Sequence, residues 1–266
     1  MEKMDRQEDE HLMAFAKQVI TEAGRETLFY YGRGRSDTRF DEALITETEL
    51  RLTEYFQDQI YAHFPEHRIF MNRQEDEGYT HQKQRYLWVF DPLDGVANFQ
   101  GGIPVWGQSV ALLENSWPVF GVFYMPATGD MFHARAGGGA YWKGMKMEVS
   151  DQQGIDDESV LFTYSRFHSH YRITFPGKIR SLGSTAAHLC YAAGGQAAAA
   201  LITHETYKDL AAVRVIVEAA GLRIYRLNGE EFFLNAYLDG SNIDEPLLVV
   251  SPENRDGVIG SLESLL

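Results

Sequence analysis

Cysteine is nearly absent from this chain, and basic residues are few compared with acidic ones. Cys190 is the only cysteine among 266 residues, which excludes an intramolecular disulfide. It lies in the apolar stretch Ala186–Ala193, so we expect a buried structural thiol and not a nucleophile. Lysine and arginine number 24 against 38 acidic residues, a formal net charge of −14. This balance argues against nucleic acid or an anionic membrane as the main partner.

Long apolar runs are also missing. No stretch reaches the ~18 uninterrupted apolar residues of a membrane-spanning helix. Residues Met1–Arg6 are too polar for the apolar core of a secretory signal, so we expect a cytoplasmic protein. The length, with a hydrophobic fraction of 44%, fits one large core or two joined subdomains.

Apolar spacing predicts a layered fold of helices and sheets. A period near 3.6 predicts helices at His11–Tyr31 and around Leu52–Ile60. Further expected strands are Ile69–Met71, Leu87–Phe90, Gln108–Leu113, Val119–Tyr124, Met131–Ala134, Val160–Tyr164, Ala197–Ile202, Arg223–Arg226 and Leu247–Val250, and further expected helices are Ser184–Ala193, Asp209–Ala220 and Pro252–Leu265. Paired helices beside mixed, largely antiparallel strands indicate an α/β (α+β) fold of alternating layers.

The segment Gly144–Glu158 is polar and marks a candidate boundary. We therefore expect an N-terminal α+β subdomain over residues 1–150 and a C-terminal α/β subdomain over residues 151–266. The glycine run 137–139 lacks the Gly-Lys-Ser/Thr ending of a phosphate loop, so a hairpin loop is expected there.

The most informative segment is Trp88–Phe99, which reads Trp-Val-Phe-Asp-Pro-Leu-Asp-Gly-Val-Ala-Asn-Phe. An apolar run ends in Asp91, a proline, Asp94 and a glycine, so the proline is expected to stop the strand. Two carboxylates at the end of a core strand can converge on one point. This arrangement is unfavourable in free energy unless a cation lies there. A hydrogen-bonded turn at the end of a strand is the alternative interpretation.

This segment resembles the signature of the inositol monophosphatase family, Trp-x-x-Asp-Pro-Ile/Leu-Asp-Gly-Thr-x-Asn-Phe, with Val96 at the threonine. Other segments resemble the family too: Ala43–Glu49 with Glu49 at an aspartate, Gly121–Pro126, Arg180–Ala187, and Tyr207–Ala212 with Lys208 at the tryptophan of Trp-Asp-x-Ala-Ala. The resemblance implies the family's αβαβα sandwich. It also implies a metal-dependent, lithium-sensitive phosphomonoesterase, which is commonly a homodimer.

The resemblance further implies a two-metal site. Asp91 would bridge the ions, one ion also taking Glu75 and the backbone carbonyl of Leu93, and the other taking Asp94 and Asp209. All are hard oxygen donors that suit Mg²⁺ or Mn²⁺. Substrate-binding residues would be Asp94, Gly95, Val96, Gly183, Ser184 and Asp209. Taken alone, Ser184 is a good helix N-cap, and Asp209 reads as an ordinary acid at the start of a helix.

One implied metal ligand has no direct match, because the family's Gly-Glu-Glu segment is missing. Glu75 is the chosen equivalent, with Asp76 and Glu77 as substitutes, and a solvated charge run is the alternative. Just before the second signature, the family often has an acid that binds inositol hydroxyls. This chain has His204 and Glu205 there.

The changes at Val96 and Glu49 affect one polar pair that orients the attacking water in the family. Either the longer Glu49 acts directly as the base, or the site has become weak or inactive. The leading hypothesis is a phosphatase of a small polyol or sugar phosphate that uses two-metal, in-line water attack, with Glu49, Asp91 and Asp94 as catalytic residues. Histidinol phosphate, a nucleotide 3′-phosphate and fructose bisphosphate are other candidate substrates. A non-catalytic member that binds phosphate or a partner protein is the alternative.

Overall fold

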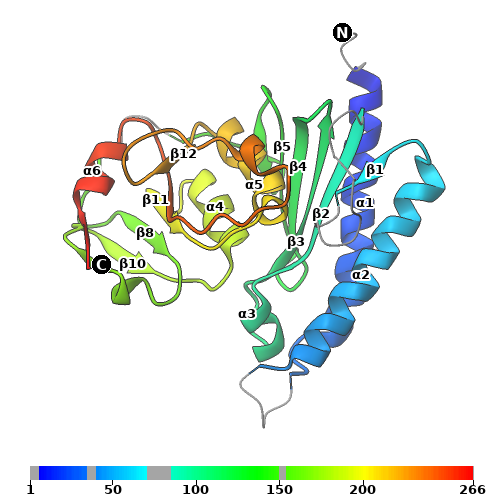
Figure 1. Ribbon diagram of the computed structural model, residues 1–266, viewed down its shortest axis with the longest axis horizontal. Coiled ribbons are helices and arrows are strands. Elements are labelled where there is room, and N and C mark those ends of the chain that lie inside the picture. The colour runs from blue at the N-terminus through cyan, green and yellow to red at the C-terminus, as the bar shows by residue number, and fades with distance from the viewer. Residues whose placement is uncertain (1–5, 35–39, 71–84, 150–153, 266) are drawn as a thin grey trace.

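The computed structural model describes residues 6–34, 40–70, 85–149 and 154–265 (Figure 1). Two long helices, a large sheet, two central helices, a smaller sheet and a short outer helix follow one another as layers. The predicted αβαβα sandwich is therefore confirmed. No helix within the described ranges is both long and apolar enough to cross a bilayer.

The first helical layer consists of α1 (Arg6–Tyr30) and α2 (Glu42–His63), which pack on one face of the large sheet. Leu12 and Ile20 of α1, Leu52 and Phe56 of α2, and Trp88 of the sheet all belong to the buried core between them. These residues include the apolar positions whose spacing predicted the two helices. Asp41 starts α2, because its side chain accepts a hydrogen bond from the N–H of Leu44.

The large sheet has seven strands in chain order, parallel only between its first two strands. They are β1 (Arg68–Ile69), β2 (Tyr86–Asp94), β3 (Gly107–Glu114), β4 (Trp117–Met125), β5 (Asp130–Arg135), β6 (Ala140–Trp142) and β7 (Met145–Met147). The central helices α4 (Thr185–Ala193) and α5 (Tyr207–Ala219) lie against its other face. A Cβ on Gly121 would lie 2.1 Å from the carbonyl oxygen of Ala212, so glycine lets α5 approach β4 closely.

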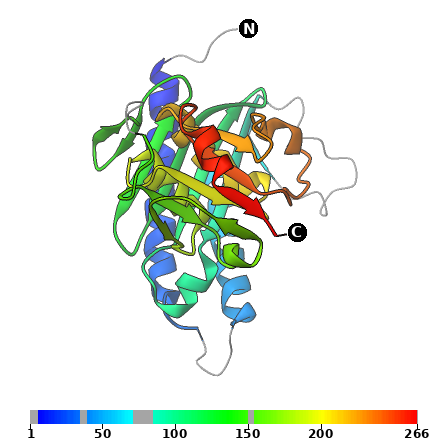
Figure 2. The same ribbon diagram turned by 90° about the vertical axis from the view of Figure 1, so that its left-hand side faces the viewer.

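The smaller sheet has the order β10-β8-β11-β13-β12. Its strands are β8 (Val160–Thr163), β10 (Lys178–Arg180), β11 (Ala199–Ile202), β12 (Arg223–Arg226) and β13 (Leu247–Val250). Its outer side is covered by α6 (Arg255–Gly260) and by the pair β9 (Tyr171–Ile173) and β14 (Leu262–Ser264), which lie toward the viewer in Figure 2. The described elements also include two short 3₁₀ helices, Phe167–Ser169 and Leu234–Tyr237.

Among the helices, one prediction is wrong and one helix was not predicted. Residues Pro252–Leu265 do not form one closing helix, because α6 ends at Gly260 and the chain then forms β14. The short helix α3 (Val96–Gly101) was not predicted, since its six residues are too few for a periodic signal. The strand predicted at Ile69–Met71 overlaps β1, and Met71 lies outside the described residues. The boundary between two subdomains near residue 150 stays a prediction.

Candidate active site

The end of β2 carries the paired aspartates of the first motif. The prediction that Pro92 stops the strand is wrong. Strand β2 continues to Asp94, with a register shift against β3 between Asp91 and Asp94. Such a bulge accommodates a proline and redirects the neighbouring side chains. The side chain of Asp91 is buried, and its Oδ1 accepts a 3.3 Å hydrogen bond from the N–H of Leu93.

Asp94 is fixed by the start of α4. Its Oδ2 accepts hydrogen bonds from the Ser184 hydroxyl and, at 3.0 Å, from the N–H of Ala186, while its Oδ1 accepts one of 3.3 Å from the N–H of Thr185. Ser184 is also the N-cap of α4, as predicted. Gly95 has a φ of 81°, and a Cβ there would lie 3.1 Å from that of Ser184. Hydrogen bonds and close packing therefore hold the first motif against the start of α4.

Asp209 lies at the third position of α5, not at its beginning as predicted. Thr206 is the N-cap, and Oδ2 of Asp209 accepts hydrogen bonds of 2.8 Å from both its N–H and its hydroxyl. This capping box fixes the first turn of α5. Among the described residues, no hydrogen bond is made by the other carboxylate oxygen of Asp209, which leaves it for a further partner.

Lys208 contributes a cation to the same place. Its Nζ lies 3.8 Å from Oδ1 of Asp91, and 30% of its side chain is exposed. Burial alone would lower the pKa of Lys208, but the charges of Asp91, Asp209 and Glu49 outweigh burial and raise it. The ammonium is therefore charged at neutral pH.

Burial raises the pKa of several acids at this site. The pKa of Asp91 rises to about 8, with the charges of Asp209 and Asp94 adding to burial and Lys208 opposing it. The pKa of Asp94 rises to about 6 by burial and by the charge of Asp209, although the bond from Ser184 lowers it. Each pKa thus responds to neighbouring carboxylates, so Asp91, Asp94 and Asp209 form one electrostatic cluster.

Glu205 is a buried acid whose place in this cluster the sequence did not establish. Its Oε1 accepts a 2.9 Å hydrogen bond from the hydroxyl of Thr185, whose backbone N–H donates to Asp94. Burial raises the pKa of Glu205 well above its usual value, and the charges of Asp209 and Asp94 raise it further. The sequence signal was limited to its position just before the second motif.

Glu49 and Val96 approach the site from α2 and α3. Glu49 is half-buried, and burial raises its pKa, with Lys208 lowering it and Asp209 raising it. Val96 packs with a small core that contains Ile45, which lies one helical turn before Glu49. The two changed positions therefore border the same region, and their roles in orienting water stay predictions.

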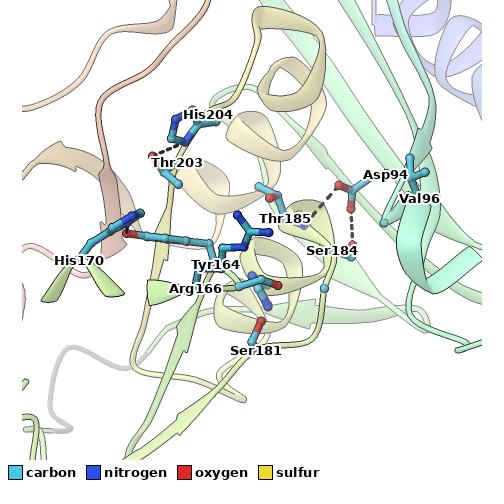
Figure 3. A pocket seen from close by; sticks show the side chains of 14 residues that line it. Asp94, Val96, Tyr164, Arg166, His170, Ser181, Ser184, Thr185, Thr203 and His204 are labelled. Atoms are coloured by element: carbon cyan, nitrogen blue, oxygen red, sulfur yellow. Dashed lines mark hydrogen bonds between the residues drawn. The ribbon is translucent and has the colours of Figure 1, made fainter. Parts of the chain in front are cut away.

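A cavity of about 480 Å³ opens beside Asp94 (Figure 3). Asp94 and Val96 lie on one side of it, and Tyr164, Arg166 and His170 lie on the other. Five of the six predicted substrate-binding residues line it, namely Asp94, Gly95, Val96, Gly183 and Ser184. Asp209 is not part of this lining within the described ranges.

Several features of the wall shape this cavity. The Tyr164 hydroxyl is 2.8 Å from Nδ1 of His170, and His204 has a left-handed φ of 57°, an uncommon conformation for a residue with a side chain. Burial lowers the pKa of His188 to about 4, so this ring is neutral, and its Nε2 accepts the N–H of Leu182. No acid besides Asp94 is among the described lining residues.

The donors present suit a hard divalent ion at the end of β2. Aspartate and backbone oxygens are the preferred ligands of Mg²⁺, and buried acids with raised pKa values are destabilising until a cation joins them. The predicted ligand Glu75, with its substitutes Asp76 and Glu77, lies outside the described residues. Within the described part of the chain, no three acidic, histidine or cysteine side chains are grouped to hold a metal. At the second of the two predicted metal positions, the side chain of Lys208 faces Asp91.

We expect the metal-free protein to lose stability as the pH rises from 5 to 8. The folded pKa of Asp91 is about 8 against an ordinary value of 3.8, so over this interval the folded state keeps a proton that the unfolded state has released. The free energy of unfolding then falls with pH, by up to ~1.4 kcal/mol per pH unit for one such group. Circular-dichroism melting in a chelator at both pH values measures the loss.

Asp91→Asn is the control for this pH dependence, because the amide has no proton to release. Its melting temperature should fall less between pH 5 and 8 than that of the wild type. Equal losses in the two proteins would show that Asp91 does not titrate in this interval.

Comparison with known proteins identifies the family. The model of the inositol monophosphatase family matches residues 8–245. A histidinol-phosphatase of Chlorobaculum parvum is 28% identical, covering 84% of this chain and 88% of the relative. A fructose-1,6-bisphosphatase/inositol-1-monophosphatase of Thermotoga maritima is 27% identical, covering 82% and 85%. Human inositol monophosphatase 1 is 28% identical, covering 72% and 74%.

Solved structures agree with this assignment at the level of the fold. The IMPase of Thermotoga maritima has a TM-score of 0.74 at 23% identity, covering 94% of this chain and 96% of that chain. Inositol monophosphatase II of Staphylococcus aureus has a TM-score of 0.75 at 20% identity, covering 94% of each. The chain therefore belongs to the inositol monophosphatase family of metal-dependent phosphomonoesterases.

Proposed function

We propose that this protein hydrolyses a small polyol or sugar phosphate, such as inositol monophosphate, with Mg²⁺ or Mn²⁺ held at the end of β2. One observation carries the proposal: the charge of Asp209, from one motif, raises the pKa of both Asp91 and Asp94, from another motif, and Asp94 lines a cavity of about 480 Å³. Cavities of this size accept small-molecule ligands.

In this mechanism, Asp91, Asp94 and the carbonyl of Leu93 would hold the metal, with Glu75 as the proposed further ligand. When bound there, the metal would supply neutralisation of the charge on the phosphoryl oxygens and on the leaving alkoxide. Glu49 accepts a proton from the water that attacks in line with the leaving oxygen. Its burial favours this role, because a raised pKa makes a carboxylate a better base near neutral pH.

The cavity wall opposite Asp94 favours a substrate whose non-phosphate part is neutral or anionic and disfavours one in which this part is cationic. Arg166 is exposed there, and no ion pair involves its guanidinium within the described ranges. His170 and His204 line the same side. A protonated amine, as in histidinol phosphate, would therefore meet a cation and no acid on this side.

Phosphate release over a panel of esters tests the function and the substrate class together. With Mg²⁺ or Mn²⁺ present, we expect kcat/KM for inositol monophosphate and fructose bisphosphate to exceed that for histidinol phosphate at least ~10-fold, the effect of about 1.4 kcal/mol. Absence of metal-dependent release from every ester would contradict the proposed function. A preference for histidinol phosphate would contradict the substrate class.

Arg166→Ala should narrow the difference between the anionic and the cationic ester, because it removes the charge that distinguishes them. Arg85→Ala is the matched control, since Arg85 is exposed just before β2, is not among the residues that line the cavity, and pairs with Glu114. An unchanged ratio in Arg166→Ala would show that this guanidinium does not contact the substrate.

A weak or inactive member that binds phosphate is the second candidate. Lys208, 3.8 Å from Asp91, favours it, because a protein cation there competes with a metal ion. The same panel separates the candidates, since this one predicts phosphate binding without metal-dependent release. On the resemblance to the family we also propose a cytoplasmic homodimer, which light scattering and localisation of the tagged protein would test.

A further inference from the structure

Lys208 occupies the second position of α5, in the turn that the capping box fixes. The neighbouring Tyr207 is buried, and Asp209 is held by Thr206 on its other side. A residue in such a turn has little freedom to redirect its backbone, so the orientation of Lys208 is set by the fold. Its side chain reaches the end of β2, in a different layer of the sandwich.

The Lys208 ammonium is paired with one carboxylate and interacts electrostatically with two others. Asp91 of β2 is 3.8 Å from Nζ, and its side chain is only 5% exposed. The charges of Asp209 on α5 and Glu49 on α2 act on the same ammonium. Carboxylates of α2, β2 and α5 therefore all favour the charged form of Lys208.

Lys208 neutralises part of the negative charge of this acidic cluster. Asp91, Asp94, Asp209 and Glu205 interact electrostatically, and Glu49 interacts with Asp209. Lys208 is the one cation that acts on both Asp91 and Glu49 among the described residues. An ammonium beside Asp91 neutralises part of the charge that would attract an ion, and it repels a divalent ion that binds next to it. Lys208 and the N–H of Leu93 both approach Oδ1 of Asp91, and among the described residues no hydrogen bond or ion pair involves Oδ2, which leaves that oxygen for an ion.

We propose that Lys208 is a built-in cation of the active site, whose ammonium takes the place of one of the two divalent ions between Asp91 and Asp209. The chain then binds one divalent ion, at Asp91, Asp94 and the carbonyl of Leu93. This inference rests on the proposed metal-dependent function. It differs from that function in predicting how many ions the site accepts, and in assigning part of the charge neutralisation to a side chain.

Calorimetric titration of the metal-free protein with Mn²⁺ tests the proposal. We expect one ion per wild-type chain. Lys208→Met, which keeps the length of the side chain without its charge, should accept a second ion, or bind it at least ~10-fold more tightly than the wild type does. Lys208→Arg should keep a stoichiometry of one, and Lys146→Met, an exposed lysine of β7, is the control for lysine removal. Two ions of equal affinity in wild type and Lys208→Met would overturn the proposal.

Melting of the same proteins in a chelator gives a second measurement that does not depend on turnover. Lys208→Met should melt at a lower temperature than Lys146→Met at pH 8, because it leaves the carboxylates without their cation, and Mn²⁺ should restore most of the difference. A Lys208→Met protein as stable as the control without metal would contradict the role of the ammonium.

The outcomes also separate this inference from the proposed function. Metal-dependent phosphate release with two ions per wild-type chain would refute the built-in cation and leave the phosphatase intact. One ion per chain without release of phosphate would support the built-in cation and refute the phosphatase.

Discussion

Asp94→Asn should abolish metal-dependent phosphate release, with a loss greater than ~10³-fold in kcat. Asp94 lies at the wall of the cavity and interacts electrostatically with Asp209, so it is the acid best placed to act on both metal and substrate. Loss of a group that only supports a ligand typically costs 10- to 100-fold, and loss of the ligand itself should cost more. Release of phosphate from inositol monophosphate at saturating Mg²⁺ measures the effect.

Ser184→Ala is the matched control for this loss. It removes the hydroxyl that donates to Asp94 and caps α4, but it keeps the carboxylate. We expect a destabilisation of ~1 kcal/mol from the lost cap and a fall in kcat of only 10- to 100-fold. If Asp94→Asn keeps more than a tenth of the wild-type rate while remaining folded, Asp94 is a structural cap of α4 and not a metal ligand.

The layers of the fold could be predicted because apolar periodicity records which face of an element is buried. Leu52, Phe56 and Ile60 repeat at helical spacing, and all three lie in the core beneath α2. Short elements carry no such record. The helix α3 has one turn and a half, and its start depends on Gly95 in a left-handed conformation, which an Asp-Gly pair indicates only as a turn.

The chemical site could be predicted only as a set of acids, not as an arrangement. The motif placed Asp91 and Asp94 together, but the bulge that carries β2 past Pro92 depends on pairing with β3. Whether Lys208 points into the cluster depends on where α5 begins, and that is set by Thr206, one residue before the matching motif. The burial of Glu205 comes from its pairing with Ile243, which is distant in sequence.

Glu49→Gln should lower kcat by 10²- to 10⁴-fold if Glu49 is the base that compensates for the missing hydroxyl at Val96. Its half-buried carboxylate interacts with Asp209 and Lys208, so it faces the cluster from α2. Glutamine keeps the length and the packing of the side chain but cannot accept a proton. Glu47→Gln is the control, because Glu47 lies on the same helix, is exposed and pairs with Arg51.

The pair Val96→Thr and Glu49→Asp, which restores the family residues, tests whether the two positions act on one water. If they do, the effects on kcat should be non-additive, because groups that orient the same molecule are coupled. If the site has instead lost its activity, wild type should release little phosphate, and the double variant should raise release by ~10²-fold, the low end of a recovered acid–base contact. Efficient wild-type turnover that survives Glu49→Ala would rule out Glu49 as the base. Additive effects of the two restorations would place Val96 and Glu49 on separate tasks, with the water then positioned by the aspartates at the end of β2.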